Sequence, residues 1–169
     1  MAGPVKGAGR ITRLALLTAI ALTIFLAEAQ LPALTAVPGV KLGLANIVTV
    51  YAMFALGPGD ALLVLSGRVF LGAVFSGQMM TLIYSAAGGF LSWCVLCLLR
   101  KLLTGEQIWL ASPVAAVFHN LGQLLAAAAV LRSWAVMAWL PYLIIAAILA
   151  GLFTGVAAQA LLRRLIGLS

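Results

Sequence analysis

Long apolar runs, separated by short polar or glycine- and proline-rich turns, dominate this sequence. Such runs predict membrane-spanning helices, because about 20 apolar residues cross the hydrocarbon core of a bilayer. We expect six of them, over residues 11–30, 42–56, 61–75, 79–99, 113–131 and 141–162. The second and third are short for a core about 30 Å thick. The pattern therefore predicts an all-α integral membrane protein, with a single six-helix transmembrane domain over residues 11–166.

Two of the predicted helices have a local start signal. A Gly-Pro-Gly turn at residues 57–59 precedes the third run, and Asp60 is placed to cap the helix that follows. Ser112 is expected to cap the fifth helix, with Pro113 at its first position, where a proline is tolerated.

The composition agrees with a membrane protein, since 65% of the residues are hydrophobic and 8% are charged. Soluble domains carry about 25% charged residues. The excess of 10 lysines and arginines over 3 acidic residues could indicate a nucleic-acid partner. In a membrane protein, however, basic residues mark the cytoplasmic flanks of the helices. We therefore expect a lipid membrane around the chain and no nucleic-acid partner.

The positions of the basic residues predict the orientation. Six spans put both termini on one side, together with seven basic residues: Lys6, Arg10, Arg13, Arg100, Lys101, Arg163 and Arg164. Lys41 and Arg132 lie on the other side, and Arg68 lies within the membrane. Because cytoplasmic flanks are enriched in basic residues, we expect both termini in the cytoplasm, with residues 1–10 as a basic N-terminal segment. The loop that carries Lys41 then lies on the outer face.

Several polar residues stand where a membrane helix would normally be apolar. His119, Asn120 and Gln123 fall within one sector of the fifth helix, where they either line a cavity or hydrogen-bond to neighbouring helices. Lys41 and Asn46 stand at the mouth of the second helix, and both are costly there unless they have partners.

Arg68 is the most informative of these residues. It lies about 11 Å of helix rise from either end of its run, and snorkelling covers only part of that distance. We therefore expect it to face the protein interior. Glu28 is the only plausible membrane-embedded acid, so a structural Arg68–Glu28 pair and an anion-binding arginine both stay open. Lys41, Arg68 and His119 outnumber Glu28, so a cavity that they share would favour an anionic or phosphate-bearing ligand.

Small and hydroxylated residues gather in the fourth helix, at Tyr84, Ser85 and residues 88–89. We expect the two glycines to allow close packing of helices. Cys94 and Cys97 lie in the same helix without a second cysteine pair, so we expect buried, inert thiols. The chain has one histidine, with no thiol or carboxylate near it in the sequence, which argues against a metal site.

Five motifs, in this order, resemble those of one bacterial family. They are KLGLAN at residues 41–46, SGRVFLG at 66–72, YSAAGGFLS at 84–92, HNLGQL at 119–124 and LP at 140–141. With them the chain resembles the family labelled heptaprenyl diphosphate synthase component I, also called the Gx transporter family. That family is grouped with the substrate-binding S components of energy-coupling factor (ECF) transporters. The resemblance covers nearly the whole chain after its basic start.

The resemblance implies a six-helix bundle of the ECF S-component type in the cytoplasmic membrane of a bacterium. It implies a ligand pocket near the outer face, under the loop between the first two helices. It also implies that an AxxxA pattern in the first helix docks onto a transmembrane coupling subunit, which works with ATPases. Ala15 and Ala19 match that pattern, although the spacing alone would favour ordinary packing within the protein.

We therefore expect a substrate-binding transport protein for a small anionic, isoprenoid-like or vitamin-like molecule. The alternative is a non-catalytic membrane subunit associated with a polyprenyl diphosphate synthase or with a quinone or flavin redox system. The candidate ligand-binding residues are Glu28, Lys41, Asn46, Arg68, Tyr84, Ser85, His119, Asn120 and Gln123.

We expect no catalytic activity of the chain on its own, and no cofactor. Chain-elongating prenyl synthases resemble one another in two aspartate-rich, magnesium-binding motifs, whereas this chain has one aspartate, Asp60. It also lacks the GxxxxGK[ST] loop that binds ATP. A membrane enzyme with His119 as its base is the weakest hypothesis, because no nucleophile or metal ligand accompanies that residue.

Overall fold

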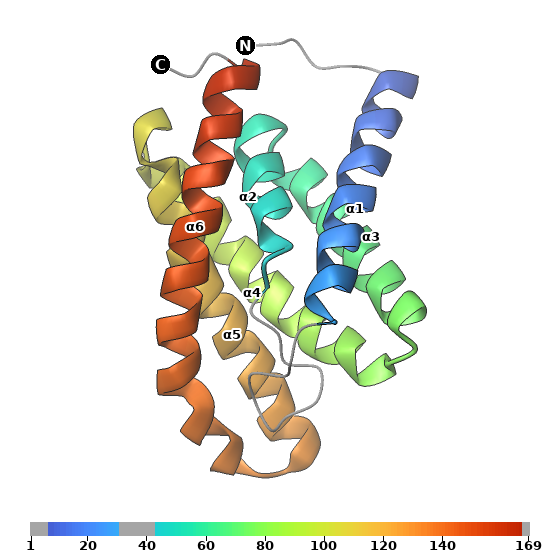
Figure 1. The fold of residues 1–169 in the computed structure, drawn as a ribbon, viewed down its shortest axis with the longest axis vertical. Coiled ribbons are helices and arrows are strands. Elements are labelled where there is room, and N and C mark those ends of the chain that lie inside the picture. Colours follow the sequence, from blue (N-terminus) through green and yellow to red (C-terminus); the bar gives the residue numbers. More distant parts are fainter. Residues whose placement is uncertain (1–6, 31–42, 167–169) are drawn as a thin grey trace.

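The computed structural model describes residues 7–30 and 43–166, and these ranges are helical, with no strand among them. The α-helices are α1 (Ala8–Glu28), α2 (Asn46–Ala55), α3 (Pro58–Ser76), α4 (Met79–Leu102), α5 (Ile108–Leu131) and α6 (Leu140–Ile166). Two short 3₁₀ helices, η1 (Gly105–Gln107) and η2 (Trp134–Trp139), lead into α5 and α6. Figure 1 shows that the long helices run roughly alongside one another, with the start of α1 and the end of α6 at the same end of the molecule.

In the described ranges, five helical segments are long and apolar enough to cross a membrane: α1, α3, α4, α5 and Trp134–Leu165. The second predicted span is much shorter than expected. Helix α2 has 10 residues, so it rises only about 15 Å, half of the hydrocarbon core. The apolar run in the sequence is longer than the helix because Gly43 to Ala45 form a turn before it. The structure thus supports an all-helical membrane protein with five spanning helices and one short inner helix.

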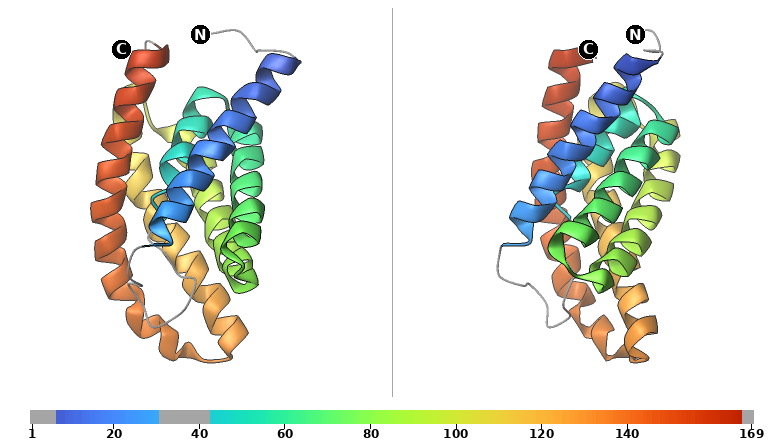
Figure 2. Two further views of the ribbon diagram at one scale, coloured as in Figure 1. Left: turned by 45° about the vertical axis from the view of Figure 1, so that its right-hand side comes forward. Right: turned by 90° about the vertical axis from the view of Figure 1, so that its right-hand side faces the viewer.

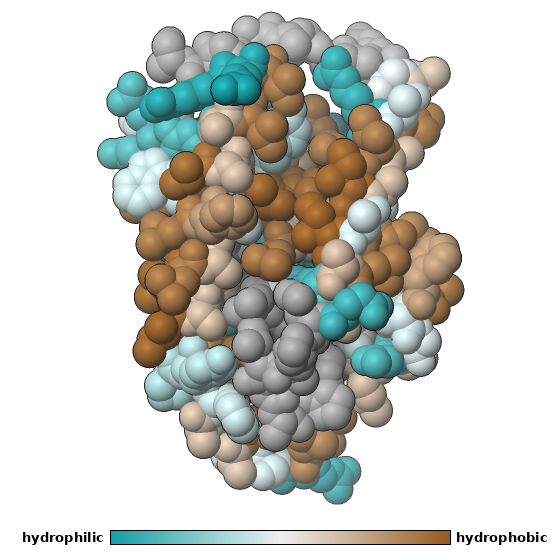
Figure 3. All heavy atoms as spheres, viewed as in Figure 1, coloured by the Kyte–Doolittle hydropathy of each residue, from teal (hydrophilic) through white to brown (hydrophobic). Residues whose placement is uncertain are grey.

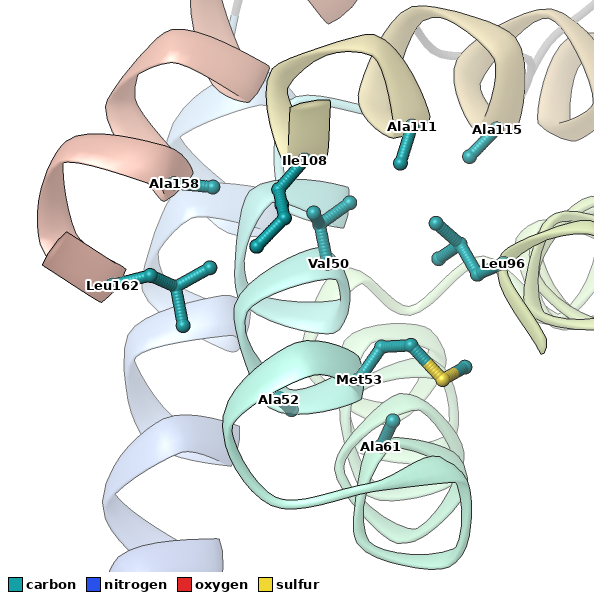
Figure 4. Packing of buried hydrophobic residues seen from close by; sticks show 10 residues of the cluster. All are labelled: Val50, Ala52, Met53, Ala61, Leu96, Ile108, Ala111, Ala115, Ala158 and Leu162. Atoms are coloured by element: carbon teal, nitrogen blue, oxygen red, sulfur yellow. The ribbon is translucent and has the colours of Figure 1, made fainter. Parts of the chain in front are cut away.

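Helix α2 lies at the centre of the bundle and contacts each of the other five α-helices. In Figure 1 it stands between α1 and α6, and the rotated views of Figure 2 keep it inside the ring of long helices. Its buried side chains meet small and branched residues from α3, α4, α5 and α6, including Ala61, Leu96, Ile108 and Leu162 (Figure 4). A short helix is tolerated here because protein, and not lipid, surrounds its ends.

Large apolar side chains cover the outside of the bundle, as the brown band in Figure 3 shows. Phe70, Phe75, Phe90, Phe153 and Leu165 are all more than half exposed. Such a surface suits lipid and would drive aggregation in water. The charged residues gather at the helix ends instead. One end carries six described basic residues, Arg10, Arg13, Arg100, Lys101, Arg163 and Arg164, and Arg132 lies beyond the opposite end of α5.

Two predicted helix starts were wrong. Asp60 makes no side-chain cap at the start of α3, where Gly57 is the cap residue and Pro58 the first helical residue. Asp60 instead pairs with Arg10 of α1, whose Nε and Nη2 lie 3.0 and 2.5 Å from its Oδ1. This ion pair ties the ends of α1 and α3 together.

Helix α5 begins five residues earlier than expected, so Pro113 lies inside it and Ser112 is not its cap. A capping box at Thr104 and Gln107 starts the 3₁₀ helix η1, which leads directly into α5 ahead of the proline. Ser112 instead shares a 2.8 Å hydrogen bond with Thr154 of α6. The prediction of two buried thiols was also wrong for Cys94, which is exposed on the lipid-facing side of α4, while Cys97 is partly buried and both are free.

Candidate ligand site

Arg68 lies in the middle of α3 and is 1% exposed. Its Nη2 donates to Oδ1 of Asn46 at 3.5 Å, the long limit of a hydrogen bond, and its guanidinium carbon lies 5.9 Å from the ring centroid of Phe25. Its Nε is buried and has no hydrogen-bond partner among the described residues. The arginine therefore faces the interior, as its mid-helix position requires, but its donors are only partly satisfied.

The carboxylate of Glu28 is bound to the backbone that leads into α2. Its Oε1 accepts from the backbone nitrogen of Gly43 at 2.7 Å, and its Oε2 accepts from that of Leu44 at 3.0 Å. A carboxylate is favourable there, because it meets free amides at the start of a helix. Between described residues the structure records one ion pair, Arg10 with Asp60, so a direct Arg68–Glu28 salt bridge is not formed.

Gly43 brings α2 and α5 together at the same place. Its φ is +79°, a conformation that favours glycine. A Cβ built on it would lie 2.8 Å from Nδ2 of Asn46 and 3.0 and 3.2 Å from Cδ2 and Nε2 of His119. The backbone at Gly43, the amide of Asn46 and the ring of His119 are therefore neighbours, and Asn46 connects them to Arg68.

The polar stripe of α5, which consists of His119, Asn120 and Gln123, has two roles. Asn120 donates from Nδ2 to the backbone oxygen of Leu143 at 3.1 Å, which joins α5 to α6. Nε2 of His119 lies 3.0 Å from Nε2 of Gln123, one turn along the same helix. The three residues are at most 1% exposed, and Nδ1 of His119 and Oδ1 of Asn120 have no hydrogen-bond partner within residues 7–30 and 43–166.

Tyr84 and Ser85 are buried, but the structure does not join them to Arg68, Asn46 or His119 by any hydrogen bond among the described residues. Tyr84 packs in an apolar cluster with Leu124 and Val136 of neighbouring elements. Lys41, the remaining predicted ligand residue, lies outside the described residues, as does Lys6.

The glycines of α4 do allow close packing. A Cβ on Gly88 would lie 2.5 Å from the backbone oxygen of His119, and one on Gly122 of α5 would lie 2.8 Å from Cα of Gly88. The two helices thus meet backbone to backbone beside the polar stripe, which fixes the position of His119.

Sequence reasoning missed two polar groups of the interior, Thr49 on α2 and Ser92 on α4. Both side-chain oxygens are buried without a hydrogen-bond partner in the part of the chain that the structure describes. The spacing along the helices places each of them on the same face as a predicted site residue, because Thr49 lies three residues after Asn46 and Ser92 lies seven after Ser85. With them, six unpartnered buried polar atoms come from α2, α3, α4 and α5: Asn46 Nδ2, Thr49 Oγ1, Arg68 Nε, Ser92 Oγ, His119 Nδ1 and Asn120 Oδ1.

Two further expectations concern metal binding and partner docking. No group of three or more His, Cys, Asp or Glu side chains that could hold a metal occurs within residues 7–30 and 43–166. Ala15 and Ala19 are exposed on α1, so neither is used for packing within the described part of the protein.

Apolar spanning helices around a buried polar interior define an integral membrane protein. The chain belongs to the family described as heptaprenyl diphosphate synthase component I, whose model matches residues 17–161. The matched region contains every candidate ligand residue and, of the two docking alanines, only Ala19. Comparison with curated proteins and with solved structures finds no match.

Proposed function

We propose that this protein is a non-catalytic membrane component that binds a small anionic ligand at Arg68. The supporting observation is the state of the guanidinium, which is 1% exposed, has one long hydrogen bond and has an unpartnered Nε. Each unsatisfied buried polar group costs about 1–3 kcal/mol, and more when it is charged. An anion between Arg68 and Asn46 would remove that cost.

The neighbouring groups suit the same ligand. Nδ2 of Asn46 is a second unpartnered donor, and the ring of His119 lies next to it across Gly43. The carboxylate of Glu28 accepts from two backbone amides and forms no direct salt bridge with Arg68. The planar fork of arginine favours carboxylate or phosphate oxygens over other acceptors.

The family's name favours one form of this proposal. In that form the chain is a membrane subunit that works beside a polyprenyl diphosphate synthase. A quinone or flavin redox system is an alternative partner that the family's name does not mention. An isoprenoid diphosphate combines an anionic group for Arg68 with an apolar tail for the bundle. The chain would not catalyse elongation, because its single aspartate, Asp60, lies at the helix ends in an ion pair with Arg10.

A substrate-binding transport protein of the ECF S-component type is the second candidate. The observation that favours it is the exposure of Ala15 and Ala19 on α1, which leaves a small-residue stripe open to another membrane helix. Its partners would be a transmembrane coupling subunit and ATPases. In both candidates the six basic residues at one end support a cytoplasmic location for the termini, in a bacterial cytoplasmic membrane.

Two experiments test the proposal. Purified protein in lipid nanodiscs is titrated with inorganic diphosphate, farnesyl diphosphate and a panel of anionic vitamins, with Arg68→Gln and the exposed Arg13→Gln as a matched pair. Binding that Arg68→Gln removes and Arg13→Gln keeps supports a ligand at Arg68. Affinity purification from the native membrane then separates the candidates, since a soluble synthase supports the first and a coupling subunit with ATPases supports the second.

A further inference from the structure

A groove opens between the start of α5 and the end of α6, and Arg68 is not among its lining residues. It is an open groove with a volume of about 590 Å³, lined by Glu106 and Trp109 on one side and by residues of α6 from Val156 to Arg164 on the other. The groove lies at the end of the bundle where the basic residues gather. Nothing in the proposed function uses it.

Hydrogen bonds hold the two walls of the groove together. Gln159 accepts from the backbone nitrogen of Trp109 at 2.9 Å and donates to the backbone oxygen of Glu106 at 2.7 Å. Gly155 allows the helices to approach below this point, because a Cβ there would lie 2.3 Å from the backbone oxygen of Trp109. The groove is therefore a fixed feature of the α5–α6 contact.

The lining changes from apolar to cationic along α6. Val156 and Ala160 are exposed in the deeper part, and Arg163 and Arg164 follow in the last turn of the helix. Arg163 lies seven residues after Val156, which is a rise of about 10 Å along the axis of α6. A phospholipid has the same order, with its acyl chain inward and its phosphate at the surface.

The charge of the groove is positive. Arg163 and Arg164 are exposed, and neither forms an ion pair with another described residue. Glu106 opposes them with one carboxylate, which leaves an excess of one positive charge. Trp109 is 36% exposed beside them, and tryptophan is enriched at the level of lipid headgroups.

We propose that this groove binds an anionic phospholipid, with the headgroup phosphate on Arg163 and Arg164 and an acyl chain along Val156 and Ala160. Basic pockets between helices at the cytoplasmic surface bind anionic headgroups in this way. The bound lipid fills a gap between α5 and α6 that the protein itself leaves open.

Native mass spectrometry of the full chain tests the proposal, with phosphatidylglycerol and phosphatidylcholine supplied in equal amounts. The wild type retains phosphatidylglycerol preferentially. R163Q/R164Q reduces that preference by about 30-fold, the factor expected for two basic residues near a lipid surface. R100Q/K101Q removes the same charge from the same end of the molecule on α4 and leaves most of the preference.

E106Q increases the retention of phosphatidylglycerol by up to about fivefold, because it removes the carboxylate that opposes the two arginines. A purely structural role of the groove would not produce this increase, and E106Q keeps the backbone oxygen that Gln159 uses. Equal losses in R163Q/R164Q and R100Q/K101Q would overturn the proposal. So would displacement of the lipid by inorganic phosphate at low millimolar concentration, which would identify a free-phosphate site instead.

Discussion

Oε1 of Glu28 accepts a hydrogen bond from the backbone nitrogen of Gly43 at 2.7 Å, and this contact decides how the buried charges of the bundle are arranged. The acid that the sequence offers as a partner for Arg68 is bound to the backbone before α2. Arg68 contacts the amide of Asn46 instead. The interior thus holds a guanidinium without a direct carboxylate partner.

A double-mutant cycle of Glu28→Ala and Arg68→Ala measures this arrangement. We expect a coupling energy well below the cost of about 3–5 kcal/mol for breaking a true buried pair, because the two charges attract each other but form no salt bridge. Each single variant loses stability for its own reason: Glu28→Ala frees two backbone amides, and Arg68→Ala leaves Asn46 unpaired. The free energies of unfolding come from SDS titration in mixed micelles. If the double mutant instead recovers most of the stability that each single variant loses, Glu28 and Arg68 form a structural pair.

Gly43→Ala is expected to destabilise the protein and to weaken ligand binding. The new Cβ would clash with Asn46 and His119, and the φ of +79° would be strained, at a cost of about 1–3 kcal/mol for strain alone. Gly77→Ala isolates the strain, because Gly77 has a φ of +65° with no atom within 4 Å of its Cβ position. Gly59→Ala is the neutral control, since it has neither strain nor contacts. Equal melting temperatures for Gly43→Ala and Gly77→Ala would show that the clash at Gly43 is unimportant.

Asn120→Leu is expected to lower stability without changing ligand affinity, because the side chain joins α5 to α6 through the backbone oxygen of Leu143. Interhelical hydrogen bonds of this kind contribute about 0.6–1.7 kcal/mol. Ser112→Ala, which removes another side-chain hydrogen bond between these helices, should behave in the same way. The comparison uses SDS unfolding and a diphosphate titration of the same samples. A large loss of affinity in Asn120→Leu alone would assign Asn120 to the ligand.

Ala15→Leu with Ala19→Leu should leave the fold intact, because both residues are exposed, and should reduce recovery of a partner membrane subunit. Leucine side chains would hold the partner's backbone away from α1. Ala86→Leu, at an exposed position of α4, serves as the control. Quantitative co-purification from the native membrane gives the result. Unchanged recovery with the double variant would show that Ala15 and Ala19 do not contact a partner subunit.

The apolar pattern predicts the helices well because a chain segment in lipid must hydrogen-bond its own backbone polar groups, which a helix does. It fails at α2, since an apolar run does not reveal that Gly43 to Ala45 turn before the helix begins at Asn46. It also misplaces the start of α5, because the 3₁₀ helix η1, with its capping box at Thr104, already leads into α5 at Ile108.

The site is only partly predictable for a different reason. The burial of Arg68 could be predicted, because an arginine in the middle of a spanning helix is costly if it faces lipid. The partners of Glu28 do not follow, because they are backbone amides of Gly43 and Leu44 and every residue except proline carries such a group. The spacing of Ser92 from Ser85 places both residues on one face of α4, but it does not reveal that the Ser92 oxygen lacks a hydrogen-bond partner among the described residues.

Titration of farnesyl diphosphate into nanodisc-embedded protein tests the central claim, that Arg68 binds an anion, most directly. We expect saturable binding, with affinity reduced about 10- to 100-fold by Arg68→Gln, in line with hydrogen bonds to charged groups. Arg68→Lys should also weaken binding, because the charge remains but the planar fork is lost. Arg13→Gln should bind as the wild type does, and circular dichroism with size-exclusion chromatography confirms that every variant is folded. Wild-type affinity in folded Arg68→Gln would contradict the account.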